Sequence, residues 1–142
     1  TFLSVPAVNK AIADQTPVCA FMFDLDGLKT INNTFGHEEG NFAISVLAHA
    51  LENSTDETAI CSRQGGDEFW VLAFDYTPEK ASSLMNHVTK YLNNYNKLHP
   101  KEYQIQTSCG YAVKVPESYA DLTEMFREAD LNMYAQKQSK TK

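Results

Sequence analysis

Arg63-Gln64-Gly65-Gly66-Asp67-Glu68-Phe69 is the stretch that decides the fold, because it lies between two apolar runs of strand length. Glycine readily adopts the positive φ angles that tight hairpin turns require, so strand, Gly-Gly, strand predicts a β-hairpin over about 57–75. Two adjacent carboxylates, Asp67 and Glu68, follow the glycines. Acidic residues are poor strand formers, and like charges side by side repel. This turn is therefore either ordinary solvated polarity or a site for a cation.

A second pair of carboxylates, Asp24 and Asp26, follows the apolar run 18–23. A continuous apolar run of this length predicts a strand that is buried on both faces. Mg²⁺ takes oxygen ligands and often binds one or two carboxylates together with substrate phosphates. If this strand and the hairpin are neighbours in one sheet, Asp24 and Asp67 can share a metal ion. The alternative is that Asp24 or Asp26 caps the helix that follows.

Length and composition exclude several classes of protein. The 142 residues suit one domain with its own core, and 43% hydrophobic with 21% charged residues argues against disorder. The net charge of −6 does not favour binding to nucleic acid, although a metal ion can offset the phosphates of a nucleotide substrate. No apolar run reaches the length of a membrane span, and no signal peptide is recognisable. We therefore expect a cytoplasmic domain without direct membrane contact.

Three cysteines, Cys19, Cys61 and Cys109, lie in apolar strand-like runs without the spacing of a metal site. The simplest interpretation is buried free thiols in a reducing compartment. The chain begins with Thr1 rather than Met. We therefore expect residues 1–142 to be a single domain excised from a larger protein.

Hydrophobic periodicity predicts helices and strands in the order αβααββαβα. The predicted helices cover 2–14, 28–35, 41–53, 77–98 and 119–138, and the strands cover 18–24, the hairpin and 103–115. Gly110, inside the last strand, predicts a bulge or the close approach of another segment. The order favours an α+β fold with a central, mostly antiparallel sheet of about five strands flanked by helices.

Four motifs in the chain resemble those of the GGDEF domains, the diguanylate cyclases. The first is residues 65–69, which spell the family signature, and the second is residues 24–40, which read DLDGLKTINNTFGHEEG. The third is Thr107-Ser108-Cys109-Gly110, and the last covers residues 129–137. Their order and spacing match the family over nearly the whole chain.

The resemblance implies a fold like nucleotidyl-cyclase cores and polymerase palms. It also implies that two GTP molecules condense to cyclic di-GMP with release of pyrophosphate, across a homodimer in which each domain holds one GTP. Two Mg²⁺ or Mn²⁺ ions per active site would stabilise the attacking and leaving oxygens. Sensor or regulatory domains of the same polypeptide are the further partners implied, including a membrane-anchored sensor with this domain in the cytoplasm.

The resemblance also assigns roles to single residues. Asp24, the Leu25 carbonyl and Asp67 would hold the metal ions. Asp67 would help to deprotonate the attacking hydroxyl and Glu68 would support the site, so these two are the candidate catalytic residues. The resemblance also implies substrate-binding residues. The phosphates would be bound by Gly27, Leu28, Lys29 and Lys137. Gly65 and Gly66 would let the nucleotide approach the hairpin backbone, and Asn32 and Asn41 would contact the guanine.

Asn41 departs from the family, in which this position is usually an Asp that accepts hydrogen bonds from guanine. An amide presents one acceptor, and its NH₂ group would face another donor unless it turns away. The loss of charged acceptance costs about 1–3 kcal/mol. We therefore expect weakened or relaxed guanine selectivity that admits ATP.

Other departures lie outside the base site. The position of the family's phosphate-binding Arg is Thr141 here, with Lys140 or Lys142 as substitutes. The Arg and Asp of the family's product-inhibition motif R-x-x-D correspond to Asp56 and Ala59. We therefore expect no product-inhibition site. Asn132 and Gln136 replace small residues, which predicts looser packing of the last helix. The family's opening motif is missing from the sequence, and we expect it to have been cut away just before Thr1. Asn41 and Thr141 keep an alternative open, in which a degenerate domain binds GTP or a partner and regulates without turnover.

Overall fold

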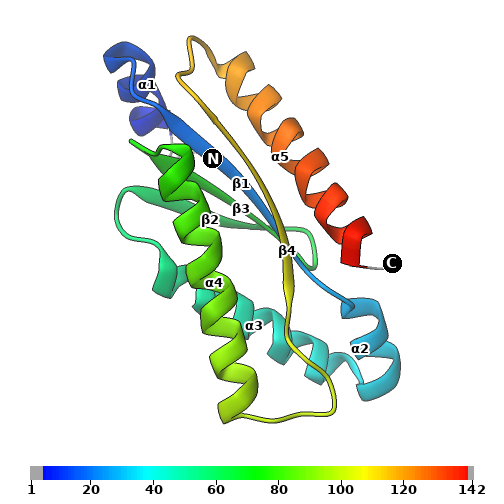
Figure 1. The fold of residues 1–142 in the computed structure, drawn as a ribbon. Coiled ribbons are helices and arrows are strands. Elements are labelled where there is room, and N and C mark those ends of the chain that lie inside the picture. The colour runs from blue at the N-terminus through cyan, green and yellow to red at the C-terminus, as the bar shows by residue number, and fades with distance from the viewer. Residues whose placement is uncertain (1–4, 141–142) are drawn as a thin grey trace.

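The computed structural model describes residues 5–140, which form a single sheet with helices on both of its faces (Figure 1). In chain order the elements are α1 (Val5–Asp14), β1 (Val18–Leu25), α2 (Leu28–Phe35), α3 (His37–Ser54), β2 (Ala59–Gln64), β3 (Glu68–Phe74), α4 (Pro78–Leu98), β4 (Thr107–Lys114) and α5 (Tyr119–Lys140). This order confirms the predicted α+β arrangement. The strands are all antiparallel in the order β2-β3-β1-β4, and the described residues form four strands rather than about five.

The apolar run of β1 is buried because this strand lies between β3 and β4 and has helices on each side. Cys19, Phe21 and Phe23 pack with side chains of α3 and α4 on one face. Val18 and Ala20 pack with α1 and α5 on the other face. Burial on both faces explains why the strand carries a continuous apolar run instead of an alternating one. The first polar side chain of β1, Asp24, therefore comes only where the strand ends.

Gly110 marks the place where α5 crosses β4. A Cβ atom at Gly110 would lie 2.1 Å from the Ala129 carbonyl oxygen and 2.2 Å from the Met133 backbone nitrogen. Only glycine leaves room for this contact between helix and strand backbones. The predicted close approach is thus confirmed, and it sets the position of the C-terminal half of α5.

Two sequence-based expectations about the strands are wrong. The last strand begins at Thr107 rather than at 103, because the Asn96 side chain takes both backbone groups of Ile105, donating to its oxygen and accepting from its nitrogen at 3.0 Å each. Cys61 is exposed on the edge strand β2, whereas Cys19 and Cys109 are buried as expected. Burial raises the pKa of Cys19 to about 12, so this thiol stays protonated.

The helices differ less from expectation. The helix over 28–35 has the predicted bounds, whereas α3 begins at His37, four residues before the predicted start. The predicted first helix extends into residues 1–4, and Thr141 and Lys142 are the last two residues of the chain. Residues 1–4 and 141–142 lie outside the described residues. Within residues 5–140, no helix combines the length and the apolar character needed to cross a membrane.

Candidate active site at the end of strand β1

The hairpin turn lies beside the end of β1, as the sequence predicts. Strands β1 and β3 pair antiparallel with Asp24 opposite Glu68. The Leu25 backbone nitrogen donates a hydrogen bond of 3.2 Å to the Asp67 carbonyl oxygen. The pairing brings together the two acidic elements that lie far apart in the sequence, and it makes Asp24 and Asp67 neighbours.

The turn itself is short and is held by a side chain of β2. Gln64 pairs with Glu68, which leaves Gly65, Gly66 and Asp67 as the turn, and Gly65 has a φ of 67°. Arg63 donates from Nε at 3.2 Å and from Nη2 at 2.7 Å to the Gly66 carbonyl oxygen. Apart from the adjoining residues, no atom of the described chain lies within 4 Å of the place where a Cβ would stand on either glycine. The backbone of the turn is therefore open to a ligand.

Asp24 is the most unusual carboxylate of the site. Its Oδ2 accepts a hydrogen bond of 2.5 Å from Lys137 Nζ, while its Oδ1 is buried and has no hydrogen-bond partner among residues 5–140. Burial raises the pKa of Asp24 to about 6; the Lys137 hydrogen bond opposes this shift and the Asp67 carboxyl adds to it. Buried polar atoms are rarely left unpaired in folded proteins. Asp24 Oδ1 is therefore a candidate ligand for a cation.

The donor set fits a divalent ion that keeps part of its shell for the substrate. Within residues 5–140, no cluster of three or more His, Cys, Asp or Glu side chains could hold a metal ion. The expected ligands are only two carboxylates, from Asp24 and Asp67, and the Leu25 carbonyl. Mg²⁺ sites in phosphate-handling enzymes typically use one or two carboxylates and complete the shell with phosphate oxygens and water. The unpartnered Asp24 oxygen agrees with this chemistry.

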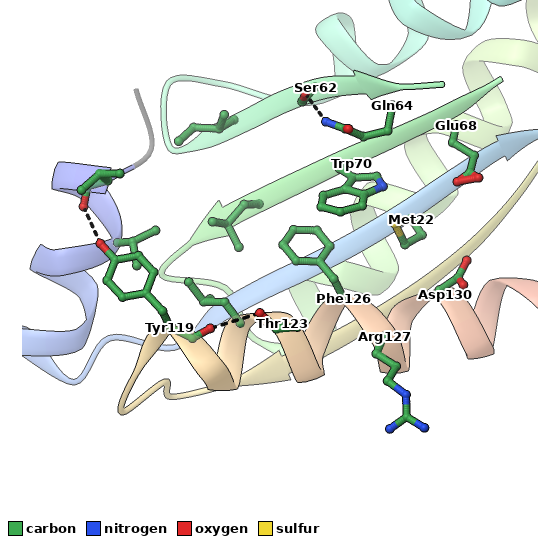
Figure 2. A pocket seen from close by; sticks show the side chains of 15 residues that line it. Met22, Ser62, Gln64, Glu68, Trp70, Tyr119, Thr123, Phe126, Arg127 and Asp130 are labelled. Atoms are coloured by element: carbon green, nitrogen blue, oxygen red, sulfur yellow. Dashed lines mark hydrogen bonds between the residues drawn. The ribbon is translucent and has the colours of Figure 1, made fainter. Parts of the chain in front are cut away.

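Glu68 faces the α5 side of the sheet, at one end of an apolar groove (Figure 2). The groove has a volume of about 720 Å³ and contains the stacked rings of Trp70 and Phe126, whose centroids are 4.7 Å apart. Asp130 of α5 lies at the same end as Glu68. Burial, with the nearby Asp130 and Asp67 carboxylates, raises the pKa of Glu68. This part of the site thus favours positive charge.

Asp26 does not cap the following helix, so that alternative is wrong for this residue. Its Oδ1 accepts from Ser108 Oγ at 2.6 Å and its Oδ2 from Lys140 Nζ at 2.8 Å. The N-cap position of α2 is Gly27, with a φ of 71° and no side-chain hydrogen bond. A helix start without a side-chain cap offers its amides to an anion. Gly27 and Leu28 therefore lie where terminal phosphates would be held.

The implied base-binding residues lie where α2 and α3 meet. A Cβ atom on Gly40 would be only 1.8 Å from Asn32 Oδ1, so the glycine makes room for this side chain. Asn32 is half-buried, and Asn41 is exposed immediately after Gly40. Lys29 is exposed in the first turn of α2. The structure thus brings the Asn32 side chain to the start of α3, beside Gly40.

Sequence reasoning missed the roles of several residues that shape this site. Arg63 closes the turn, Asp130 of α5 lies near Glu68, and Ser108 with Lys140 holds Asp26. Ser108 is fully buried in β4, and a buried hydroxyl between apolar strand residues is a signal of a hydrogen-bonded partner. Nothing in the sequence marks Asp130, because its position depends on how α5 crosses the sheet.

Comparison with known proteins identifies the family to which the chain is similar. Residues 5–142 match the family model described as "Diguanylate cyclase, GGDEF domain". Among curated relatives, the probable diguanylate cyclase DgcJ of Escherichia coli K12 is 34% identical over 134 residues, which are 94% of this chain and 26% of DgcJ. The probable diguanylate cyclase DgcT of the same organism is 30% identical over 142 residues, covering 97% of this chain and 31% of DgcT. The chain thus spans less than a third of the length of either relative.

Solved structures show the same fold. The active GGEEF domain of a diguanylate cyclase from Vibrio cholerae superposes with a TM-score of 0.82 at 24% identity, over 94% of this chain and 85% of that one. The GGDEF domain of DgcB from Caulobacter crescentus, in complex with c-di-GMP, gives a TM-score of 0.83 at 21% identity, over 94% and 80%. With the family match over residues 5–142 and the Asp24–Asp67 geometry, these likenesses lead to one conclusion: the chain belongs to the GGDEF family of diguanylate cyclase domains.

Proposed function

We propose that this domain condenses two GTP molecules into cyclic di-GMP and releases two pyrophosphates, in a metal-dependent reaction across a homodimer. The observation that carries the proposal is the end of β1, where Asp24 lies beside the Asp67 turn with one buried, unpartnered carboxylate oxygen. The similarity to proteins named as diguanylate cyclases supports it.

Three protein groups would hold the metal ions in this proposal. Asp24, the Leu25 carbonyl and Asp67 would bind two Mg²⁺ or Mn²⁺ ions, which when bound stabilise the attacking and leaving oxygens of an in-line displacement. Asp67 helps to take the proton from the attacking ribose 3′-hydroxyl. Glu68 supports the site from the neighbouring ladder position, opposite Asp24.

Other groups of the chain bind and orient the nucleotide. The amides of Gly27 and Leu28 hold the terminal phosphates at the uncapped start of α2, and Lys29 and Lys137 add positive charge. Asn32 and Asn41 hydrogen-bond the guanine edge. The open turn at Gly65 and Gly66 lets the nucleotide approach the backbone closely. Binding of this kind holds the reacting groups in one geometry, which lowers the entropic part of the barrier.

Two nucleotides must meet, and the proposed site holds one per domain, so two domains act face to face. The known structure of the cyclase SiaD with its activator SiaC, and the bifunctional relative MucR, support regulation by partners or attached domains. We propose that sensor or regulatory domains of the same polypeptide control this domain in the cytoplasm. At the positions of the product-inhibition motif, Asp56 Oδ1 instead accepts from the Thr58 backbone nitrogen at 2.8 Å, and we expect no product inhibition through Asp56 and Ala59.

A second candidate function is a regulatory domain that binds GTP without turnover. Two observations favour it: Asn41 lacks the charged acceptor for guanine, and Lys137 neutralises Asp24 in the free domain. The two functions differ in turnover and share nucleotide binding, so product formation separates them.

The experiment that tests the proposal is product formation from GTP, and separately from ATP, with Mg²⁺ or Mn²⁺ at high protein concentration. Asp67→Ala serves as the blank, and Asp14→Asn removes a carboxylate on the distant helix α1 as a matched control. A cyclic dinucleotide that persists in Asp14→Asn and disappears in Asp67→Ala is the expected result. GTP binding without product in the intact domain would instead assign the regulatory function.

A further inference from the structure

Lys137 forms an ion pair with Asp24, one of the expected metal ligands. Its Nζ lies 2.5 Å from Asp24 Oδ2, and the side chains of Lys137 and Asp24 are 32% and 13% exposed. Lys137 follows Met133 by one helical turn, and Met133 is held against Gly110 of β4. The helix backbone that carries Lys137 is therefore fixed, and the contact with Asp24 is made by the long lysine side chain alone.

We infer that Lys137 is a built-in counter-cation, which competes with the metal ion for Asp24 while no nucleotide is bound. The inference rests on the proposed function, because it concerns the metal site assigned there. A largely buried carboxylate without a counter-charge is costly, and the ammonium group provides that charge. A divalent ion at Asp24 Oδ1 would lie close to the ammonium group on Oδ2, and the repulsion between them disfavours Lys137 in this position.

The chemistry of lysine suits a group that has two positions. Its ammonium is a point charge on a flexible four-carbon stem, so it can move without moving the helix. Nucleotide phosphates offer the displaced ammonium a new partner at the same site. Metal and nucleotide then strengthen each other's binding, because both favour the position in which Lys137 has left Asp24. Whichever ligand binds first displaces Lys137, and the second ligand does not have to displace it again.

Lys140, one turn further along α5, is held differently and provides a control. Its Nζ donates to Asp26 Oδ2 at 2.8 Å and to the Thr107 carbonyl oxygen at 2.6 Å. Asp26 also accepts from Ser108. A lysine with two acceptors, one of them in the backbone of β4, anchors the helix end and does not contact Asp24.

The test measures Mn²⁺ binding to the nucleotide-free domain by calorimetry or electron paramagnetic resonance. Lys137→Met, which keeps the stem and removes the charge, is compared with the wild type, the charge-conserving Lys137→Arg and the control Lys140→Met. The expected result is about tenfold tighter Mn²⁺ binding in Lys137→Met only. Saturating GTP should abolish most of this difference, because the nucleotide already draws Lys137 away from Asp24.

Two results would count against the inference, and they are distinguishable from failure of the proposed function. Mn²⁺ affinity that is equal or lower in Lys137→Met than in the wild type overturns the competition, while the metal site stands if Asp24→Asn abolishes binding. Mn²⁺ binding that is absent in every variant even with saturating GTP, or unaffected by Asp24→Asn and Asp67→Ala, overturns the metal site of the proposed function itself. Thermal unfolding in the absence of metal verifies that each variant is folded.

Discussion

Asn41 lies in the proposed guanine site, at a position where the family resemblance leads us to expect Asp. It is exposed directly after Gly40, and Gly40 makes room for the Asn32 side chain. An Asp at position 41 would accept hydrogen bonds from guanine N1–H and the 2-amino group with both of its oxygens, whereas the amide nitrogen of Asn41 meets these donors with another donor. Under the proposed function, the base selectivity of the site therefore depends on a single atom of this side chain.

We predict that Asn41→Asp strengthens GTP binding by about 1–3 kcal/mol and leaves ATP binding unchanged or weaker. Calorimetric titration with each nucleotide measures the difference. Asn33→Asp, an exposed residue of α2 with the same change of charge, is the matched control. Equal GTP affinity in Asn41→Asp and the wild type would refute the role of Asn41, and an equal gain in both variants would assign it to net charge.

Glu39 is a second residue whose surroundings predict a measurable effect, here on stability. Its Oε1 accepts from Lys101 Nζ at 2.7 Å and from Tyr103 Oη at 2.8 Å, which ties α3 to the segment before β4. These two hydrogen bonds lower the pKa of Glu39 below its ordinary value of 4.5. A carboxylate with a lowered pKa in the folded state stabilises that state above its unfolded-state pKa, and the stabilisation is lost as pH falls through the folded-state value.

We predict that Tyr103→Phe lowers the free energy of unfolding at pH 7, and that its effect shrinks as the pH falls below the ordinary value of 4.5. Urea unfolding of the wild type and the variant across this pH range measures the effect. Tyr134→Phe, at an exposed position of α5, controls for the loss of a hydroxyl. A Tyr103→Phe effect that does not depend on pH would show that the hydroxyl stabilises the fold through a contact other than the Glu39 carboxylate, such as the Glu39 carbonyl oxygen at 3.5 Å.

At the scale of elements, helix α5 covers both a face and an edge of the sheet. Strand β4 is an edge strand, so backbone groups of alternate residues point away from β1. Three side chains at four-residue spacing on α5 reach these groups. Asn132 Nδ2 donates to the Tyr111 oxygen at 3.1 Å, Gln136 Oε1 accepts from the Cys109 nitrogen at 2.7 Å, and Lys140 Nζ donates to the Thr107 oxygen at 2.6 Å.

The expectation that Asn132 and Gln136 loosen the packing of α5 overlooked this role. Exposed edge strands invite pairing with other chains, and covering their free backbone groups prevents it. We predict that Asn132→Ala with Gln136→Ala lowers the free energy of unfolding by about 1–3 kcal/mol, since each hydrogen bond contributes about 0.5–1.5 kcal/mol. We also expect self-association, which sedimentation velocity detects. Glu128→Ala, an exposed change on the same helix, should have neither effect; if it matches the double variant, the edge contacts are not the cause.

The elements show what the sequence predicts well and where it fails. Local patterns, such as the apolar run of β1 and the periodicity over 28–35, predicted their elements correctly. In both cases the signal, burial or helical periodicity, is carried by residues that are close together in the sequence. The pairing of Asp24 with the Asp67 turn followed from two strand ends in one sheet. The contacts of Lys137 depend on how α5 crosses β4, and the late start of β4 depends on the Asn96 side chain of α4. Such long-range contacts leave no periodic signal.

At the scale of the whole molecule, the proposed function requires two domains, because each domain is proposed to hold one nucleotide. The proposed product joins two nucleotides through two bonds, so under this proposal a lone domain binds substrate without completing the reaction. The helices lie on both faces of the sheet, while the turn and the start of α2 are at one end of it (Figure 1). A second domain can therefore approach this end without displacing the core.

We predict that the rate of product formation rises with the square of the domain concentration, as long as the domain is mostly monomeric by sedimentation. Fusion to a parallel two-stranded coiled coil should make the rate linear in concentration and raise it at low concentration, because the tether converts an encounter between two domains into an intramolecular one. The same fusion carrying Asp67→Ala provides the control and should stay inactive. A linear rate in the untethered, monomeric domain would mean that one domain completes the reaction alone, and the homodimer would then be wrong.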